Sequence, residues 1–272
     1  MKNTKQNLFS LAGKTALVTG SAGLLGRQHC IALANAGADV VVTDINLEPC
    51  CEIAKALPTQ SIGLELDITD PLSIKTAKKQ SLQKYKQIDI LVNNAALNDM
   101  VESQHQKTNI QKFEEYSLTS WEGQLKINIT GVFLCCQIIG GYMASKGSGS
   151  IINIASTYAL VAPDQSLYQD RQGKQRFLKN AAYPVTKAAV LSLTRYLAAY
   201  WGHRDVRVNA LSPGGVENHQ DDWFIDNYKN RTPLNKMALP QDYQGAIIFL
   251  ASDASAYMTG ANLVVDGGWT IW

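Results

Sequence analysis

The chain has 272 residues, of which 46% are hydrophobic, and its 25 Lys and Arg against 23 Asp and Glu give a net charge of +2. This length and composition can bury one sizeable core, so we expect a single catalytic domain over residues 1–272. A net charge this close to zero does not indicate binding to nucleic acid or to a membrane surface. No run reaches the roughly 18 apolar residues of a membrane span, and residues 1–6 lack a signal-peptide core. We therefore expect a cytoplasmic protein that binds neither nucleic acid nor membrane.

The cysteines and histidines do not suggest a metal site. The five cysteines include two adjacent pairs, Cys50/Cys51 and Cys135/Cys136, without Cys-x-x-Cys spacing. Such residues are typical of reduced, packed cysteines in a cytoplasmic protein. The histidines show no ligand spacing, and we expect them on helix or loop surfaces. They are His29, His105, His203 and His219.

The first elements predict a nucleotide-binding unit. Residues 14–20 form a short apolar run that ends in Gly, as a buried parallel strand should. A turn with Gly20, Gly23 and Gly26 follows, then a helical stretch over 27–36. A second strand over 39–43 ends at Asp44. In this arrangement the glycines let the backbone approach a pyrophosphate at a helix N-terminus, and the acid bonds the adenosine ribose.

Asp44 also predicts which dinucleotide binds. A carboxylate accepts hydrogen bonds from a free 2′-hydroxyl and repels a 2′-phosphate. The neighbouring residues 21–22 and 45–46 include no Arg or Lys that could hold such a phosphate. We therefore predict NAD as the cofactor rather than NADP.

Strands and helices alternate through the rest of the chain. Strands are expected near 62–66, 88–92, 150–155, 206–210 and 262–265. The helix that begins near Pro71 has Thr69 or Asp70 as its cap. The helix over 121–145 carries an apolar stripe that is more typical of a core or a subunit interface than of a ligand site; the stripe includes Ile127, Val132, Phe133, Ile138 and Ile139. Right-handed crossovers then predict an α/β fold, a Rossmann-type doubly wound parallel sheet with the cofactor at the carboxyl edge of its strands.

Tyr183 and Lys187 form a candidate proton-transfer pair. They lie four residues apart in a predicted helix whose first turn holds Tyr183 and Pro184. That spacing puts both side chains on one helix face. A phenol titrates near pH 10, so it transfers protons at neutral pH only if a nearby cation, here Lys187, stabilises the phenolate. Tyr142 and Lys146 have the same spacing, so this pattern alone does not choose between the pairs.

Further motifs occur in a fixed order. Residues 66–68 form an acid-plus-aliphatic step, residues 93–96 read Asn-Asn-Ala-Ala, Asn128 lies in the 121–145 helix and Ser156 follows a strand. With residues 207–214 and 264–268, this order resembles the short-chain dehydrogenase/reductases of classical length, from about residue 11 to residue 268. More faintly, the chain resembles oxidoreductases of flagellin modification and nonulosonic-sugar pathways. The family order of Asn, Ser, Tyr and Lys favours Tyr183, because Tyr142 precedes Ser156.

The resemblance implies reversible hydride transfer between an alcohol carbon and nicotinamide. Tyr183 would exchange the hydroxyl proton, and Lys187 would lower the phenol pKa and hold the nicotinamide ribose. Ser156 would bind the substrate oxygen, and Asn128 would anchor a water that relays protons. The resemblance also implies a homodimer or homotetramer. The implied cofactor-binding residues are Gly20, Ser21, Gly23, Leu24, Leu25, Asp44, Ile45, Asp67, Ile68, Asn94, Ala95, Ala96, Tyr183, Lys187, Pro213, Gly214, Val216 and Asn218.

The chain departs from the family pattern at several positions. Leu24 follows Gly23 in a spacing more typical of the longer, sugar-nucleotide-modifying branch. Ala96 replaces a usual Gly, and Asn218 stands where many members have Thr. Ser156 and Tyr183 are separated by about twice the usual number of residues, because a polar insert occupies 163–180.

The substrate hypothesis depends on two polar excursions. The insert over 163–180 and the segment over 97–109 leave strand ends on one edge, which suits a hydroxyl-rich or anionic small molecule. We hypothesise an NAD-linked sugar or sugar-acid dehydrogenase in which Arg171 or Arg176 grips a carboxylate or phosphate. Alternatively, both segments are solvated loops or contact a neighbouring subunit. Two other functions stay open, a 3-oxoacyl thioester reductase and a non-catalytic nucleotide-binding regulator.

Overall fold

The computed structural model describes residues 7–98 and 112–272. Within these residues, seven parallel strands form one sheet in the order β3-β2-β1-β4-β5-β6-β7. The strands are β1 (Thr15–Thr19), β2 (Asp39–Asp44), β3 (Ile62–Glu65), β4 (Ile90–Asn93), β5 (Gly149–Ile154), β6 (Val206–Pro213) and β7 (Asn262–Val265). The strand order reverses between β1 and β4, and such a switch point is where doubly wound sheets bind their ligands. The predicted doubly wound parallel sheet is confirmed.

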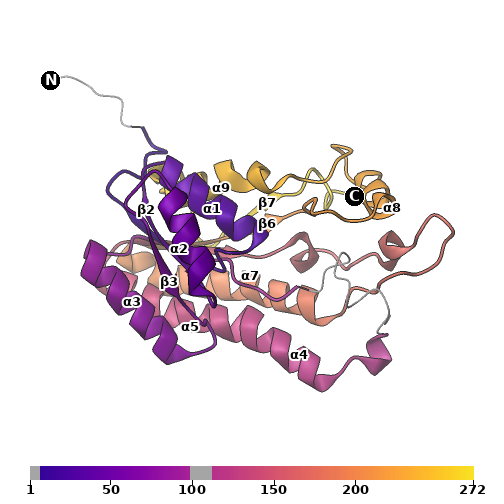
Figure 1. Cartoon of the computed structure of the whole chain (residues 1–272), viewed down its shortest axis with the longest axis horizontal. Coiled ribbons are helices and arrows are strands. Elements are labelled where there is room, and N and C mark those ends of the chain that lie inside the picture. Colours follow the sequence, from indigo (N-terminus) through magenta and orange to yellow (C-terminus); the bar gives the residue numbers. More distant parts are fainter. Residues whose placement is uncertain (1–6, 99–111) are drawn as a thin grey trace.

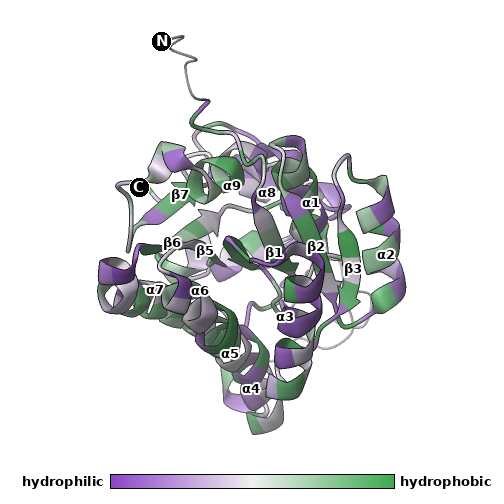
Figure 2. Ribbon diagram, turned by 90° about the vertical axis from the view of Figure 1, so that its left-hand side faces the viewer, coloured by the Kyte–Doolittle hydropathy of each residue, from purple (hydrophilic) through white to green (hydrophobic). Residues whose placement is uncertain are grey.

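Helices cover both faces of the sheet (Figures 1 and 2). On one face lie α1 (Leu24–Asn35), α2 (Leu47–Ala56) and α9 (Gln244–Ala251), and on the other lie α3 (Pro71–Tyr85), α7 (Ala182–Trp201) and a long helix between them in the sequence. This long helix, Leu118–Lys146, comprises α4 (Leu118–Leu125), α5 (Val132–Cys135) and α6 (Gly141–Lys146), with π-helical turns at Lys126–Gly131 and Cys136–Gly140. The remaining α-helix, α8 (Asp222–Lys229), covers neither face and lies beyond the edge of the sheet (Figure 1).

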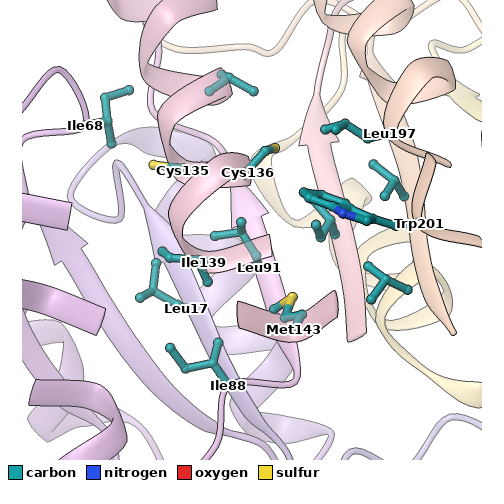
Figure 3. Packing of buried hydrophobic residues seen from close by; sticks show 14 of the residues in the cluster. Leu17, Ile68, Ile88, Leu91, Cys135, Cys136, Ile139, Met143, Leu197 and Trp201 are labelled. Atoms are coloured by element: carbon teal, nitrogen blue, oxygen red, sulfur yellow. The ribbon is translucent and has the colours of Figure 1, made fainter. Parts of the chain in front are cut away.

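The alternation of side chains along the strands divides the core in two. Ala16 and Val18 of β1 face the cluster formed by α1, α2 and α9, whereas Leu17 between them faces α3, the long helix and α7. Successive side chains of a strand point to opposite faces, so a sheet covered on both sides needs apolar residues at every position. Figure 3 shows the second cluster, in which Ile139 of the long helix and Trp201 of α7 pack over β1, β4 and β5.

The apolar stripe of the long helix is only partly core. Val132 and Ile139 are buried, Ile127 and Ile138 are partly buried, and Phe133 is 45% exposed. By length and composition this helix could also cross a membrane, although no run in the sequence had suggested it. Half of its most apolar window is buried within the fold, as is usual for the core helix of a folded domain. The helix is therefore only a weak indication of a membrane span.

Local signals in the sequence had mixed outcomes. Asp70, one of the two proposed caps, caps α3 by accepting a 2.8 Å hydrogen bond from the Leu72 N–H. His203 and His219 are exposed as expected, and His105 lies outside the described residues. The expected surface position is wrong for His29, which is fully buried because α1 packs against both the sheet and α9. This burial lowers the pKa of His29 to about 3.

Candidate active site

The glycine turn connects β1 to α1 at the centre of the sheet. Gly20 has φ +65°, and a Cβ atom there would lie 2.6 Å from Cα of Ala95. A Cβ atom on Gly26 would lie 2.1 Å from the carbonyl oxygen of Gly20. A side chain is therefore excluded at Gly20 and at Gly26. The first turn of α1, whose N-cap is Gly23 without a side-chain cap, faces the cavity. Unpaired N–H groups at such a helix end are suited to binding a phosphate.

Polar contacts tie this turn to the end of β4. The Asn94 side-chain amide donates to the carbonyl oxygens of Thr19 and Gly20, at 3.0 and 2.9 Å. The Thr19 hydroxyl oxygen accepts the N–H groups of Asn94 and Ala95, both at 3.0 Å. The residues predicted to surround the cofactor at the two strand ends are thus held in one rigid unit.

Asp44 lies at the end of β2, beside the glycine turn. Its carboxylate accepts the N–H of Ala22 at 3.0 Å and that of Ile45 at 2.8 Å. These bonds fix the carboxylate at the wall of the cavity. Asp67 also lines the cavity, and it accepts both the N–H and the hydroxyl of Thr69, at 2.7 and 2.8 Å.

These residues line one cavity of about 1140 Å³ along the carboxyl ends of the strands. Its wall includes most of the predicted cofactor residues: Gly20, Gly23, Leu24, Leu25, Asp44, Ile45, Asp67, Ile68, Asn94, Ala95, Ala96, Tyr183, Lys187, Pro213, Gly214, Val216 and Asn218. A dinucleotide therefore fits the residues present. Ser21 is the exception, because its buried hydroxyl donates to Val18 O at 2.8 Å and its N–H donates to Thr43 O. Ser21 holds the turn on β2 and is not brought to the cavity.

Ser156 and Tyr183 meet at the other end of this cavity. Ser156 lies two residues after the end of β5, and its hydroxyl oxygen accepts the Tyr158 N–H at 3.1 Å. Tyr183 lies in the first turn of α7, where its N–H donates to Asn180 Oδ1 at 3.1 Å. Loss of water around the phenol raises the pKa of Tyr183 to about 12, and the hydrogen bond with Ser156 acts in the opposite direction. The phenol therefore needs positive charge nearby to ionise at neutral pH.

Lys187 is one source of that charge. Its buried ammonium donates to Ile154 O at 2.7 Å and lies 5.7 Å from the centre of the Tyr183 ring. Burial lowers the pKa of Lys187 to about 8, so the ammonium form still predominates at pH 7. The structure therefore brings together Ser156, Tyr183 and Lys187. Tyr142 of the competing pair is elsewhere, on α6, with its hydroxyl 3.4 Å from Lys86 O.

Asn128 is buried in the first π-helical turn and does not line the cavity. Its side-chain oxygen accepts the Leu97 N–H at 2.7 Å, and its amide donates to Leu97 O at 2.9 Å and to the Thr186 hydroxyl at 3.1 Å. Thr186 in turn donates to Tyr183 O at 2.8 Å. The Asn128 side chain thus links the segment after β4 to the helix that carries Tyr183, and its role in a water relay stays a prediction.

The insert packs against α8 and forms part of the cavity wall near Tyr183. Leu167, Tyr168 and Phe177 from the insert are buried in an aromatic cluster with residues around α8; the other members are Phe224, Tyr228, Met237 and Trp269. The Asn227 side chain also donates to the carbonyl oxygens of Leu167 and Gln169, at 3.0 and 2.8 Å. The sequence analysis placed the insert over the site but named only Arg171 and Arg176 as its contacts. The wall residues that it missed near Tyr183 and α8 include Tyr158, Tyr168, Phe177, Lys179, Phe224, Tyr228 and Met237.

The two arginines proposed to bind substrate are not in the cavity. Arg171 pairs with Asp226 at 3.2 Å and Arg176 with Asp170 at 2.6 Å, and neither side chain lines the wall. The insert turns both outward, where carboxylates and water satisfy them. Its cation in the cavity is Lys179 instead. Of the segment over 97–109, Leu97 and Asn98 line the cavity and residues 99–109 lie outside the described residues.

The chain is similar to known oxidoreductases along nearly its whole length. The family model described as Enoyl-(Acyl carrier protein) reductase matches residues 20–270. The chain is 36% identical to D-threitol dehydrogenase of Mycolicibacterium smegmatis, over 97% of this chain and 95% of that protein. It is 31% identical to NAD-dependent glycerol dehydrogenase of Listeria innocua, over 97% and 96%.

A solved structure extends the similarity to the fold. The gluconate 5-dehydrogenase of Burkholderia cenocepacia, in complex with NADP and tartrate, has a TM-score of 0.83 and 29% identity, covering 97% of this chain and 98% of that one. The ordered motifs, the Ser156–Tyr183–Lys187 arrangement and these matches have one explanation: the chain belongs to the short-chain dehydrogenase/reductase family.

Proposed function

We propose that this oxidoreductase is an NAD-dependent dehydrogenase that interconverts a secondary alcohol and a ketone on a hydroxyl-rich or sugar-acid substrate. The observation that carries the proposal is the Ser156–Tyr183 hydrogen bond, which lies beside Lys187 in the cavity that also contains Asp44. A proton-transfer group and a dinucleotide site thus share one cavity. Chemistry on a hydroxyl-bearing carbon requires both.

The residues divide the work of proton transfer. A bound nicotinamide cofactor supplies the hydride acceptor or donor at this site. In oxidation Tyr183 accepts the substrate hydroxyl proton on its phenolic oxygen, and in reduction it returns that proton. Ser156 donates a hydrogen bond to the substrate oxygen and keeps it within reach of Tyr183. The Lys187 ammonium stabilises the phenolate and holds the nicotinamide ribose.

The preference for NAD is supported by the fixed carboxylate of Asp44. The N–H groups of Ala22 and Ile45 donate to this carboxylate and keep it at the cavity wall. There it would accept hydrogen bonds from the adenosine ribose hydroxyls of NAD and repel the 2′-phosphate of NADP. One relative is named as NAD-dependent, whereas the gluconate 5-dehydrogenase structure contains NADP. The relatives therefore favour neither cofactor, and the preference for NAD rests on Asp44.

The substrate class is supported by charge and by the relatives. Among the described charged residues of the wall, Asp44 and Asp67 lie at the end expected to hold the adenosine, and Lys179 and Lys187 lie against Tyr183. Lys126 also lines the wall. Cations at the reacting end suit a hydroxyl-rich or carboxylate-bearing molecule. The named relatives act on threitol, glycerol and gluconate, which are small polyhydroxyl compounds.

The test compares Tyr183→Phe with Tyr142→Phe on a panel of polyols, aldonates and 3-oxoacyl thioesters. We expect turnover on polyols or aldonates with NAD. Tyr183→Phe should lose at least about a hundredfold in rate while still binding NAD, because it removes the acid–base hydroxyl. Tyr142→Phe should be nearly silent. Preferred turnover of the thioesters would instead favour the acyl reductase, and binding of NAD without any turnover would favour the regulator.

A further inference from the structure

Lys179 lies nearer to the ring of Tyr183 than Lys187 does. Its ammonium nitrogen is 4.4 Å from the ring centre, against 5.7 Å for Lys187. The side chain lines the cavity although only 7% of the residue is exposed. A cation at this distance over an aromatic face is attracted to the ring, and the attraction is stronger where water is excluded.

The insert holds this lysine in place through its backbone. The Lys179 N–H donates to Gln165 Oε1 at 3.0 Å, and the Gln165 amide donates back to Lys179 O at 2.9 Å. Gln175 then donates to Gln165 O at 2.8 Å and to Phe177 O at 2.7 Å. The ammonium itself donates to Asn98 Oδ1, across the cavity end. The position of the charge is therefore set before any substrate binds.

The titratable groups found around the Tyr183 phenol, in the described part of the chain, come from three elements. Lys187 is on α7, Lys179 and Tyr168 are on the insert, and Tyr158 follows β5. Burial raises the pKa values of Tyr158 and Tyr168, so both are neutral at physiological pH. Lys187 has a pKa of about 8 and loses its charge in the mildly alkaline range. A second ammonium beside the phenol would add to the positive charge that stabilises its ionised form.

We infer that Lys179 acts through Tyr183: its ammonium stabilises the phenolate together with that of Lys187 and so helps to set the pH range in which each direction of the reaction runs. The inference rests on the proposed role of Tyr183 as acid and base. The substrate proton moves to and from the Tyr183 oxygen, and Lys179 acts on that transfer only through its charge. A neighbouring cation favours the charged form of an acid, so its removal should make the phenol harder to ionise.

The first test measures pH profiles of kcat/KM in both directions. Lys179→Met removes the charge, Lys179→Gln removes it but keeps a hydrogen-bond donor, and Lys179→Arg retains it. In the two neutral variants, the acid limb of oxidation and the alkaline limb of reduction should both move up by about one pH unit. Lys179→Arg should keep the original profile. Lys174→Met, at an exposed position of the same insert, should also keep it.

The second test needs no substrate. The absorbance change on tyrosinate formation is followed in the NAD complex, and subtraction of the Tyr183→Phe titration isolates Tyr183. The isolated transition should move to higher pH in Lys179→Met and Lys179→Gln. Folding of each variant is checked by circular dichroism. This readout stays informative even if the proposed substrate class is wrong.

Two results would overturn the inference. The neutral Lys179 variants could lose the same rate in both directions, with the pH-profile limbs and the Tyr183 titration unchanged. Lys179 would then have only a structural role. A higher KM for carboxylate substrates only, again with unmoved titration, would make it a substrate-anion contact instead.

Discussion

Burial raises the pKa of Tyr183 to about 12 and lowers that of Lys187 to about 8. Both shifts disfavour the charged forms that proton transfer requires, so the free protein keeps these groups in an unfavourable environment. Their opposite charges stabilise each other only when the phenol is ionised. At the scale of single residues, the site therefore holds the Lys187 ammonium at a cost in stability, and that charge can stabilise the phenolate when Tyr183 ionises.

The stability cost of Lys187 should appear as a pH dependence. Its pKa is about 8 in the folded protein, against an ordinary lysine value of 10.5. The unfolded chain therefore binds one more proton between these values, and stability rises with pH across this window; the penalty is complete below pH 8. Between pH 7.5 and 9.5 the free energy of unfolding of the wild type should rise by on the order of 2 kcal/mol relative to Lys187→Met. Urea denaturation of both proteins at the two pH values measures the difference, and parallel pH dependences would contradict it.

The carboxylate of Asp44 should decide the cofactor. We expect NADH to bind at least about tenfold more tightly than NADPH, a difference of about 1.4 kcal/mol. Asp44→Ala should narrow that gap, because it removes both the acceptor for the ribose hydroxyls and the charge that repels a phosphate. Fluorescence titration measures both affinities. Glu52→Ala, at an exposed position of α2, removes the same charge and serves as the control. Equal affinities in the wild-type protein would contradict the prediction.

Residue positions that depend on chain spacing could be predicted from the sequence. The distance from the glycine turn to Asp44 and the step from Tyr183 to Lys187 are fixed by strand and helix geometry, and the structure places these residues on one cavity. Ser21 and His29 were misjudged because their burial depends on packing between elements. Charge alone could not rank Arg171, Arg176 and Lys179, since only the fold of the insert decides which cation points inward.

At the scale of elements, the insert and α8 behave as one unit. Their aromatic cluster is separate from the two clusters on the faces of the sheet. Within it, Tyr228 stacks on Trp269 with ring centres 4.2 Å apart, and Tyr168 stacks on Phe224 at 5.5 Å. The sequence indicated a polar excursion but not this packing, because its few aromatic residues are dispersed among charged ones. The strands and long helices were predictable because their apolar patterns are continuous.

The aromatic cluster should support substrate binding rather than cofactor binding. Phe177 is 6% exposed and lines the substrate end of the cavity. Phe177→Ala should lose packing worth about 3–5 kcal/mol, mostly within this local cluster. We expect the KM for substrate to rise about tenfold or more, with little change in NAD affinity. Arg171→Ala and Arg176→Ala, singly and together, should leave KM unchanged, because both side chains pair with carboxylates outside the cavity.

Steady-state kinetics and NAD titration distinguish these outcomes. A raised KM in the arginine double variant would mean that Arg171 or Arg176 contacts the substrate. An unchanged KM in Phe177→Ala would instead mean that the cluster does not shape the site.

At the scale of the whole molecule, the strand reversal between β1 and β4 places the carboxyl ends of both halves of the sheet around one cavity. The sequence predicted this arrangement because strand and helix patterns alternate and crossovers have one hand. It could not predict which outer surfaces meet another copy of the chain. In the structure, α7 lies along α4 (Figure 1). Tyr196 and Tyr200 of α7 are 64% and 59% exposed.

These two tyrosines should lie in a subunit interface. Their rings stack with centres 5.9 Å apart, which gives α7 an exposed apolar surface of the kind that oligomers cover. We expect a solution mass of two or four times 29.7 kDa. Replacing both tyrosines by Glu should reduce that mass, because like charges would face each other across a symmetric contact. Light scattering after size-exclusion chromatography measures it, with Leu72→Glu on α3, also an exposed apolar position, as the control. A monomeric wild type, or a double variant of unchanged mass, would exclude α7 as the interface.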